Sequence, residues 1–194
     1  MSYLKKQEWE LVPADLPPVR KNCPKCNGKT YFINSQKFRV NANSSSIDIW
    51  LIYQCEKCKS TWNMPIYERA FLKEIGQEDY HNFVSNDREM VKRYSFDKGI
   101  YSKNGVELML EELDYIVTRR EKEEYCSEEN QLAIDIRCEY PTVLRVDKLL
   151  SDTLHLSRSQ IKRMDQKHLI HEKTGNHPLK SRVKNGMSLT ITIM

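Results

Sequence analysis

The stretch that decides the N-terminal fold is residues 47–58, IDIWLIYQCEKC. Its first eight residues are rich in β-branched and aromatic side chains, which is typical of a buried strand. The stretch ends on two cysteines, Cys55 and Cys58, that are separated by two residues. This spacing lets both sulfurs reach one tetrahedral ion from a tight turn. It therefore predicts a strand that carries half of a four-cysteine metal site.

The other half of this site is CPKC, residues 23–26, which repeats the spacing. The chain between the two pairs contains the strand-like segments KTYFI and KFRV and the turn signal NANSSS. Residues 1–64 are therefore predicted to be a zinc ribbon in which β-strands hold the two turns together. With four thiolate ligands the zinc has no open position, so the site is predicted to be structural. Its predicted ligands are Cys23, Cys26, Cys55 and Cys58.

Two other chemistries fit the same cysteines. Iron can occupy a shell of four sulfurs. A single C-x-x-C pair can also be a thioredoxin-like redox pair, but that motif requires a helix N-terminus in a βαβ unit, and here strands surround both pairs. Cys126 and Cys138 do not share the spacing, and neither is assigned a role. Cys138 alternates with Ile134 and Ile136 in a strand pattern and is predicted to be a small buried hydrophobe.

The totals limit the class of protein. The 194 residues carry a net charge of +4, and 30% of them are charged, which favours small cores with much solvated surface. The sequence has no apolar run long enough for a membrane span. Its charged, proline-containing N-terminus lacks the apolar region of a secretory signal. We therefore expect a cytoplasmic protein with reduced thiols and no membrane partner.

The middle of the chain, residues 65–130, is the least informative. IYERAFLKEI (66–75) is predicted to be a short helix, and residues 77–96 are predicted to form one or two more. VELML and LDYIVT are strand candidates around a turn. The charge run RREKEEYCSEEN (119–130) is predicted to be a solvated linker between the halves of the chain. The region shows neither a Gly-rich phosphate loop nor a nucleophile–base pattern, so no enzymatic activity is expected.

Positive charge is concentrated at the C-terminal end. From Val143 to Met194 there are ten Lys and Arg but only four Asp and Glu, whereas the rest of the chain has a small acidic excess. Such an asymmetry is typical of a module that binds a polyanion, although a merely basic surface produces the same totals.

Two helices are predicted in this basic region. The first places four apolar residues on one face, namely Val146, Leu149, Leu150 and Leu154. The second begins at Ser157, which forms a capping box with Gln160, and Leu156 is placed to pack against Ile161 as a hydrophobic staple. The two helices are therefore predicted to join at a short, well-defined turn.

The second helix also carries the residues that suggest a function. Its inner face is predicted to end at His168, as a core-edge residue. Arg158 and Lys162 lie together on one flank, and Arg158 is beside the free backbone N–H groups that open the helix, which makes a natural phosphate site. A tight turn at Asn185-Gly186 and a strand with alternating apolar residues are predicted to follow.

The order LRVDKLL, LSRSQIKRM and LKSRVKNGMSLTI, within residues 144–193, resembles the RNA-binding domain of ribosomal small-subunit protein four, the alpha-L motif. That domain also occurs in pseudouridine synthases, some tRNA synthetases and ribosome-rescue factors. The resemblance implies a module of two helices and a small sheet in residues 131–194. It implies that Asp147 orients a neighbouring arginine rather than contacting RNA. The RNA-facing residues that it implies are Arg145, Lys148, Ser157, Arg158 and Lys162, with Lys180 as a further contact.

The whole chain is also similar to a family of uncharacterised bacterial proteins, mainly from Firmicutes, that is classed as a domain of unknown function. The similarity rests on DLPPVRKNCPKC, KFRVNAN, IDIWLIYQCEKCKSTWNM and LRVDKLL. It implies a bacterial, cytosolic setting and supplies no activity.

These features predict an α+β protein with a four-cysteine zinc ribbon, a short helical and strand region in the middle, and an alpha-L RNA-binding module. The predicted function is non-catalytic binding of structured RNA, either ribosomal RNA or tRNA, in association with translation. Three alternatives remain open: a DNA-binding, transcription-associated ribbon protein, a scaffold that binds a protein partner through the ribbon, and a thiol oxidoreductase.

Overall fold

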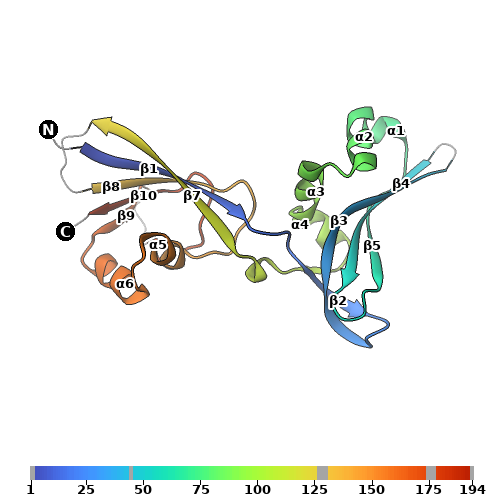
Figure 1. Cartoon of the computed structure of the whole chain (residues 1–194), viewed down its shortest axis with the longest axis horizontal. Helices are drawn as coiled ribbons and strands as arrows, with labels where there is room; N and C mark the ends of the chain where they lie inside the picture. Colours follow the sequence, from blue (N-terminus) through green and yellow to red (C-terminus); the bar gives the residue numbers. More distant parts are fainter. Residues whose placement is uncertain (1–2, 44–45, 126–130, 174–177, 193–194) are drawn as a thin grey trace. The chain divides into compact units, whose positions relative to one another are not determined.

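The computed structural model describes residues 3–43, 46–125, 131–173 and 178–192, and it is a mixed α+β fold rich in strands (Figure 1). The chain forms two compact units. We call Asp15–Leu113 the four-cysteine unit, and Met1–Ala14 together with Asp114–Met194 the helix-pair unit. These units differ from the three consecutive ranges predicted above, because the first strand of the chain pairs with strands of the C-terminal part.

The four-cysteine unit contains an antiparallel sheet with the strand order β5-β4-β3-β2-β6. A bulge in β3 between Asn34 and Phe38, where Gln36 has a φ of 59°, interrupts its pairing with β4. The alternation of buried and exposed residues along β4 follows the predicted strand IDIWLIYQ. The strands are β2 (Val19–Cys23), β3 (Gly28–Asn43), β4 (Ser46–Cys55), β5 (Thr61–Ala70) and β6 (Glu107–Leu108).

One prediction for this sheet is wrong. Residues 66–70, predicted as the start of a helix, form the end of β5 instead. Tyr67 pairs with Ile49 and Ala70 pairs with Ile47, so the long neighbouring strand β4 supplies hydrogen-bond partners that an isolated segment lacks. Only the last four residues of the predicted helix, Leu72–Ile75, are helical.

Four helices cover one face of this sheet. Two of them begin with an aspartate cap, because Asp87 accepts a hydrogen bond from the Met90 N–H at 2.8 Å and Asp97 accepts one from the Gly99 N–H at 2.9 Å. The strand predicted in VELML is shorter than expected, since β6 gives way to a 3₁₀ turn at Leu110–Glu112. The helices are α1 (Leu72–Ile75), α2 (Gln77–Ser85), α3 (Arg88–Ser95) and α4 (Lys98–Lys103).

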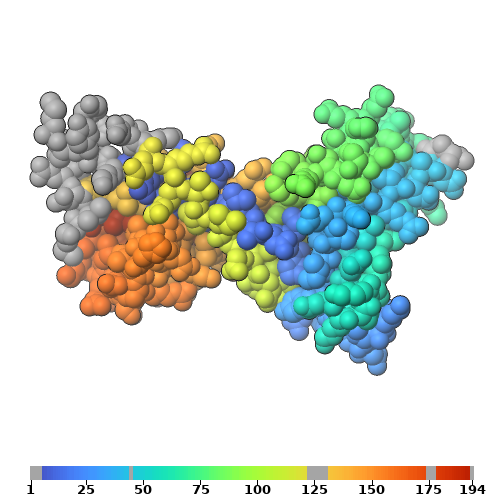
Figure 2. Space-filling view, in the orientation of Figure 1, coloured from blue at the N-terminus to red at the C-terminus, as the bar shows by residue number. Residues whose placement is uncertain are grey.

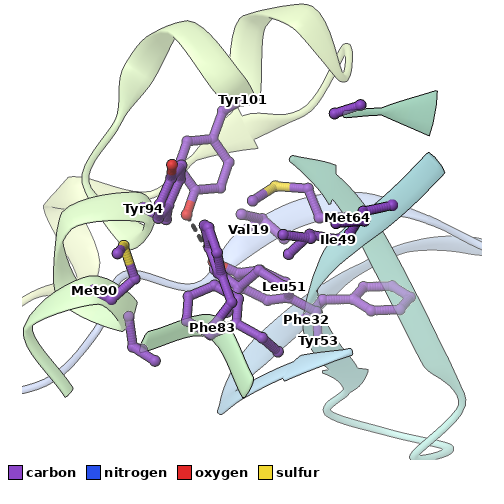
Figure 3. Close-up of a cluster of buried hydrophobic side chains, with 14 of the residues drawn as sticks. Val19, Phe32, Ile49, Leu51, Tyr53, Met64, Phe83, Met90, Tyr94 and Tyr101 are labelled. Carbon is purple, nitrogen blue, oxygen red and sulfur yellow. Dashed lines mark hydrogen bonds between the residues drawn. The ribbon is translucent and has the colours of Figure 1, made fainter. Parts of the chain in front are cut away.

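The core between helices and sheet is aromatic and contains a buried polar network (Figure 3). The Tyr53 and Tyr101 hydroxyls lie 2.7 Å apart, and the Tyr101 hydroxyl donates to the Ser95 carbonyl at 2.9 Å. The Asn34 amide donates to the Tyr53 hydroxyl at 3.0 Å and to the Ser95 hydroxyl at 2.8 Å. Each of these buried polar groups has a hydrogen-bond partner within the network. The network therefore joins α3 and α4 to the sheet without leaving the groups unpaired.

Two buried tyrosines of this core, Tyr94 and Tyr101, are expected to make the four-cysteine unit less stable in alkali. Burial raises the pKa of Tyr94 and the pKa of Tyr101 above the usual value of about 10. Above that pH the unfolded chain loses phenol protons that the folded chain keeps, so the free energy of unfolding falls as the pH rises. Urea denaturation at a series of pH values should show this decline. Tyr101→Phe should lower the free energy of unfolding by about 1–3 kcal/mol at neutral pH and make its decline with pH shallower. If the variant and the wild type lost stability with pH at the same rate, Tyr101 would not be a source of this decline.

The helix-pair unit contains a second sheet, with the strand order β7-β1-β8-β10-β9. The first strand of the chain, β1, lies between β7, with which it is antiparallel, and β8, with which it is parallel. The strands are β1 (Tyr3–Pro13), β7 (Tyr115–Tyr125), β8 (Gln131–Arg137), β9 (Ile170–Glu172) and β10 (Ser188–Thr192).

Among the described residues, none of the helices has both the length and the apolar character that a membrane span requires.

The predicted linker 119–130 is largely a strand. Residues 119–125 belong to β7, which pairs with β1 from Trp9 opposite Arg119 to Tyr3 opposite Tyr125, while residues 126–130, including Cys126, lie outside the described residues. Charged residues are compatible with an edge strand, and some of those in this run have an opposite charge nearby on β1. Arg120, for example, lies 3.5 Å from Glu10.

Two helices pack on this second sheet, as the sequence predicts: α5 (Val146–Leu154) and α6 (Arg158–Gln166). Val146, Leu149 and Leu150 of α5 are buried against Ile134 and Ile136 of β8 and other residues of the same core. The predicted turn at Asn185-Gly186 is present, with Gly186 at a φ of 77°. Leu189 and Ile191 of β10 alternate with half-buried residues, as expected for a strand with one buried face.

The prediction for His168 is wrong. Helix α6 ends at Gln166, and His168 is exposed with a φ of 54° rather than lying on the inner face. The inner face of α6 consists of Ile161, which is buried, and Met164, which packs at the edge of the core. The chain turns before His168 because the Leu169 N–H donates to the Met164 carbonyl at 3.0 Å, which closes the helix.

Candidate metal centre and helix-pair surface

The four predicted cysteine ligands come together at one end of the first sheet. Cys23 is the last residue of β2 and Cys55 is the last residue of β4. Each strand leads into a tight turn that carries the second cysteine of its pair. In the second turn the Lys59 N–H donates to the Cys55 carbonyl and the Cys55 N–H donates to the Ser60 carbonyl, both at 2.9 Å. Lys59 has a φ of 59°, which lets the chain reverse directly after Cys58.

The sulfur atoms are spaced as ligands of a single ion. The Sγ atoms of Cys23 and Cys58 are 3.5 Å apart, and those of Cys26 and Cys55 are 3.8 Å apart. All four lie within 4.8 Å of one another. A tetrahedral shell with metal–sulfur bonds of about 2.3 Å has sulfur–sulfur edges of about 3.8 Å. These separations are far longer than the roughly 2.05 Å of a disulfide, and the cysteines are free thiols.

Hydrogen bonds support the sulfurs from outside the cluster. The Ser60 hydroxyl lies 3.1 Å from the Cys58 sulfur and 3.4 Å from the Cys23 sulfur, and the buried Thr30 hydroxyl lies 3.3 Å from the Cys55 sulfur. The backbone N–H of Cys58 and the Thr30 hydroxyl lower the pKa of Cys55 to about 6. Neutral pH therefore favours the thiolate form of Cys55, which is the form that binds metal.

The thiols do not all ionise together in the metal-free chain. A hydrogen bond with Cys58 and burial raise the pKa of Cys26 to about 12, whereas a hydrogen bond from Ser60 lowers the pKa of Cys23. Four thiolates in so small a volume repel one another, so a divalent cation is the group that would allow all of them to be deprotonated. The cluster can hold one metal ion, and its four protein sulfurs would complete a tetrahedral shell.

Sequence reasoning found the cysteines but not the hydroxyls that support them. Ser60 follows the second pair by two residues, and Thr30 lies on the next strand, so only the folded sheet shows that they meet the sulfurs. Cys138 is apart from this cluster. It is buried in the helix-pair unit, where its thiol donates to the Tyr140 carbonyl at 3.1 Å and burial raises its pKa.

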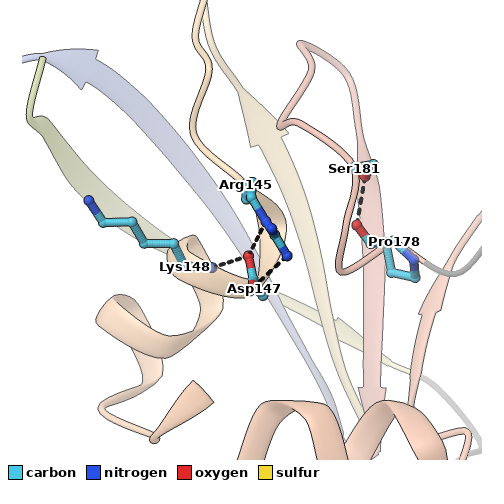
Figure 4. Close-up of polar contacts among 5 residues, drawn as sticks. All are labelled: Arg145, Asp147, Lys148, Pro178 and Ser181. Atoms are coloured by element: carbon cyan, nitrogen blue, oxygen red, sulfur yellow. Dashed lines mark hydrogen bonds and ion pairs between the residues drawn. The ribbon is translucent and has the colours of Figure 1, made fainter. Parts of the chain in front are cut away.

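The predicted RNA-facing residues lie on and beside α5 and α6. Arg145 immediately precedes α5 and donates two hydrogen bonds to Asp147, at 2.9 and 3.0 Å, so Asp147 orients this guanidinium as predicted (Figure 4). Lys148 is exposed and extends away from this pair. Of the two predicted cations at the start of α5, Arg145 is therefore held by Asp147, whereas the side chain of Lys148 extends into solvent.

The start of α6 has the capping box that the sequence predicts. The Ser157 hydroxyl accepts from the Gln160 N–H at 3.2 Å, and the Gln160 side chain accepts from the Ser157 N–H at 2.8 Å. Arg158 and Lys162 are exposed one turn apart on this helix. In the space-filling view the residues of α5 and α6, drawn in orange, form part of the surface of their unit (Figure 2). Within the described part of the chain, Lys148, Arg158 and Lys162 form no ion pair.

A segment distant in sequence adds cations at the start of α5. The Leu179 and Ser181 carbonyls accept hydrogen bonds from the Asp147 and Val146 N–H groups, at 3.2 and 3.1 Å. This contact brings exposed Lys180 to the same helix end as Arg145. Sequence reasoning missed Arg182, which is also exposed and forms a β-bridge with Arg145. No local pattern marks Arg182, because the bridge joins segments that are far apart along the chain.

Comparison with known proteins gives one result. A family model described as "Protein of unknown function (DUF1062)" matches residues 40–176, which span the second cysteine pair, the middle of the chain and both helices of the pair. The curated proteins and the solved structures give no match.

Proposed function

The chain thus belongs to the DUF1062 family, whose description assigns no activity, and we propose from its own residues that it is a non-catalytic, zinc-containing RNA-binding protein. Structured RNA, either ribosomal RNA or tRNA, is the proposed ligand, and the α5–α6 surface is its proposed binding site. In this proposal the helix pair corresponds to the alpha-L motif, and the protein acts in the bacterial cytoplasm in association with translation.

The observation that carries the proposal is the set of exposed cations on the helix pair. Lys148, Arg158 and Lys162 are exposed and form no ion pair with a carboxylate in the described part of the chain. Phosphate groups of RNA would supply the missing counter-charge. Arg158 is also the first residue of α6, so its guanidinium and the helix N-terminus would favour the same anion.

Zinc is the proposed occupant of the cysteine cluster because four thiolates at tetrahedral spacing suit this ion and leave no position for a substrate. The proposed role of the metal is structural. It would join the turns that follow β2 and β4, two strands that are separated by β3 in the sheet. Iron fits the same donors, and metal analysis of purified protein distinguishes the two.

Salt dependence tests the proposed function directly. Binding to a structured RNA such as a tRNA should weaken linearly on a plot of log affinity against log salt concentration, because each neutralised phosphate releases counterions. Contacts by three or four cations predict a slope of about −2 to −4. Fluorescence anisotropy over a range of potassium chloride concentrations measures this slope. Absence of binding at low salt would contradict the proposal.

The alternatives predict different results in the same assay. A DNA-binding ribbon protein would prefer duplex DNA over tRNA at equal salt. A protein scaffold would bind neither nucleic acid. A thiol oxidoreductase would expose reactive thiols within the cluster, whereas a zinc-filled cluster protects all four cysteines from alkylation.

A further inference from the structure

The sheet of the four-cysteine unit has one face that the helices do not use. The buried apolar and aromatic residues of α1–α4 all belong to the core cluster on the other face, together with Phe38, Leu51 and Tyr53. Because side chains alternate across a strand, the neighbours of these residues in sequence point away from the helices. We call this side the outer face.

The outer face carries a stripe of apolar and aromatic side chains across three strands. Register places Trp50 of β4 directly between Arg39 of β3 and Pro65 of β5. Each of these residues is at least partly exposed. Two residues further along β4 lies Ile52, and Ile33 of β3 is 44% exposed. Neighbouring apolar side chains that remain accessible to solvent can form a binding surface.

The charge at the metal end of this unit favours a polyanion. Three exposed lysines lie in the two cysteine turns, which contain one acidic residue, Glu56. These lysines are Lys25, Lys57 and Lys59. On the outer face itself Arg39 and Lys29 are exposed, Arg20 pairs in register with Glu107, and the Asp48 carboxylate accepts a hydrogen bond from the backbone N–H of Arg69 at 2.8 Å. The surface thus combines the ring of Trp50 with exposed cations, as single-strand nucleic-acid sites combine aromatic rings with cations.

We propose that the outer face binds a single-stranded segment of RNA, whose bases stack on Trp50 and whose phosphates pair with Arg39 and the lysines of the cysteine turns. This inference rests on the proposed function in that the protein binds RNA, but it assigns a second contact surface on the other unit. The helix pair would recognise a folded element, and the outer face would recognise an unpaired stretch.

Trp50 can be used in two ways to test this proposal, as a fluorescent probe of binding and as a site of substitution. Binding of oligouridylate to the full-length protein should quench tryptophan fluorescence, and Trp50→Phe should abolish most of the quenching while retaining much of the affinity, because phenylalanine still stacks. Trp50→Ala should weaken oligouridylate binding by about 10- to 100-fold. Phe71→Ala, which removes an aromatic residue that is 47% exposed outside this face, is the matched control and should leave the affinity unchanged.

Charge on the same face gives an independent test. Arg39→Ala should weaken oligouridylate binding and reduce the salt slope by roughly one contact, whereas Arg88→Ala, an exposed arginine at the start of α3, should do neither. Unchanged affinity in both Trp50→Ala and Arg39→Ala would overturn the proposal and leave the outer face as a surface for a protein partner. Failure of the helix-pair proposal is separate, because it would appear as normal tRNA binding by a variant of α5 and α6.

Discussion

Cys55→Ser is expected to unfold the four-cysteine unit and to release its metal. Cys55 is fully buried at the end of β4, and its sulfur lies 3.8 Å from Cys26 and 3.3 Å from the Thr30 hydroxyl. Structural zinc in a four-ligand site contributes on the order of 10 kcal/mol to folding. That is comparable to the whole stability of a domain of this size, which is about 5–15 kcal/mol. Loss of one of the four ligands therefore removes most of the stabilisation.

Metal content and folding should be measured together on the same samples. Elemental analysis of the wild-type protein should give one zinc per chain, and Cys55→Ser should give none. Near-ultraviolet circular dichroism should report the loss of the packed aromatic core around Phe38 and Phe83, whose rings are 4.8 Å apart. Cys138→Ser is the matched control, since Cys138 is buried in the other unit and this variant should keep its zinc. A Cys55→Ser protein that is metal-free and fully folded would refute a structural metal.

The second large effect is expected at the helix pair. Lys148→Glu combined with Arg158→Glu should weaken tRNA binding by about 100-fold or more, because two charge-assisted contacts are lost and two repulsive charges are introduced. The salt slope should become shallower by about two contacts. Both residues are exposed, so the free energy of unfolding should change little. Anisotropy with labelled tRNA and urea denaturation measure the two effects separately.

The control for this experiment has the same change in net charge. Arg88→Glu combined with Lys98→Glu alters the first residues of α3 and α4 in the four-cysteine unit, where both side chains are exposed and glutamate suits a helix N-terminus. This control should retain tRNA affinity close to that of the wild type. Equal losses in both double variants would mean that total charge, and not the helix-pair surface, determines binding.

The sequence predicts those features whose determinants are close together along the chain. The spacing of Cys55 and Cys58, the apolar face of α5 and the capping box of Ser157 each depend on neighbours within one or two turns, and the structure contains all three. Each of these patterns combines a backbone geometry with a side-chain requirement. A segment that must meet both requirements can adopt few other structures.

The features that the sequence does not predict depend on partners far away in the chain. Residues 119–124 are all charged and would be solvated in isolation, yet they form a strand because β1 offers a complete edge. Residues 66–70 join β5 because β4 extends beside them. The pairing of Arg145 with Arg182, and the contact of Ser60 with two sulfurs, likewise arise only when distant segments meet. Propensity and charge pattern carry no information about such partners.

The position of β1 has a consequence for synthesis on the ribosome. This strand is made first, but its two neighbours in the sheet, β7 and β8, begin only at Tyr115 and Gln131. The entire four-cysteine unit, Asp15–Leu113, is translated in between, while β1 has no partner strand. The nascent chain therefore carries an unpaired strand for the time that about a hundred residues take to emerge, so the second sheet can be completed only after the whole four-cysteine unit has been synthesised.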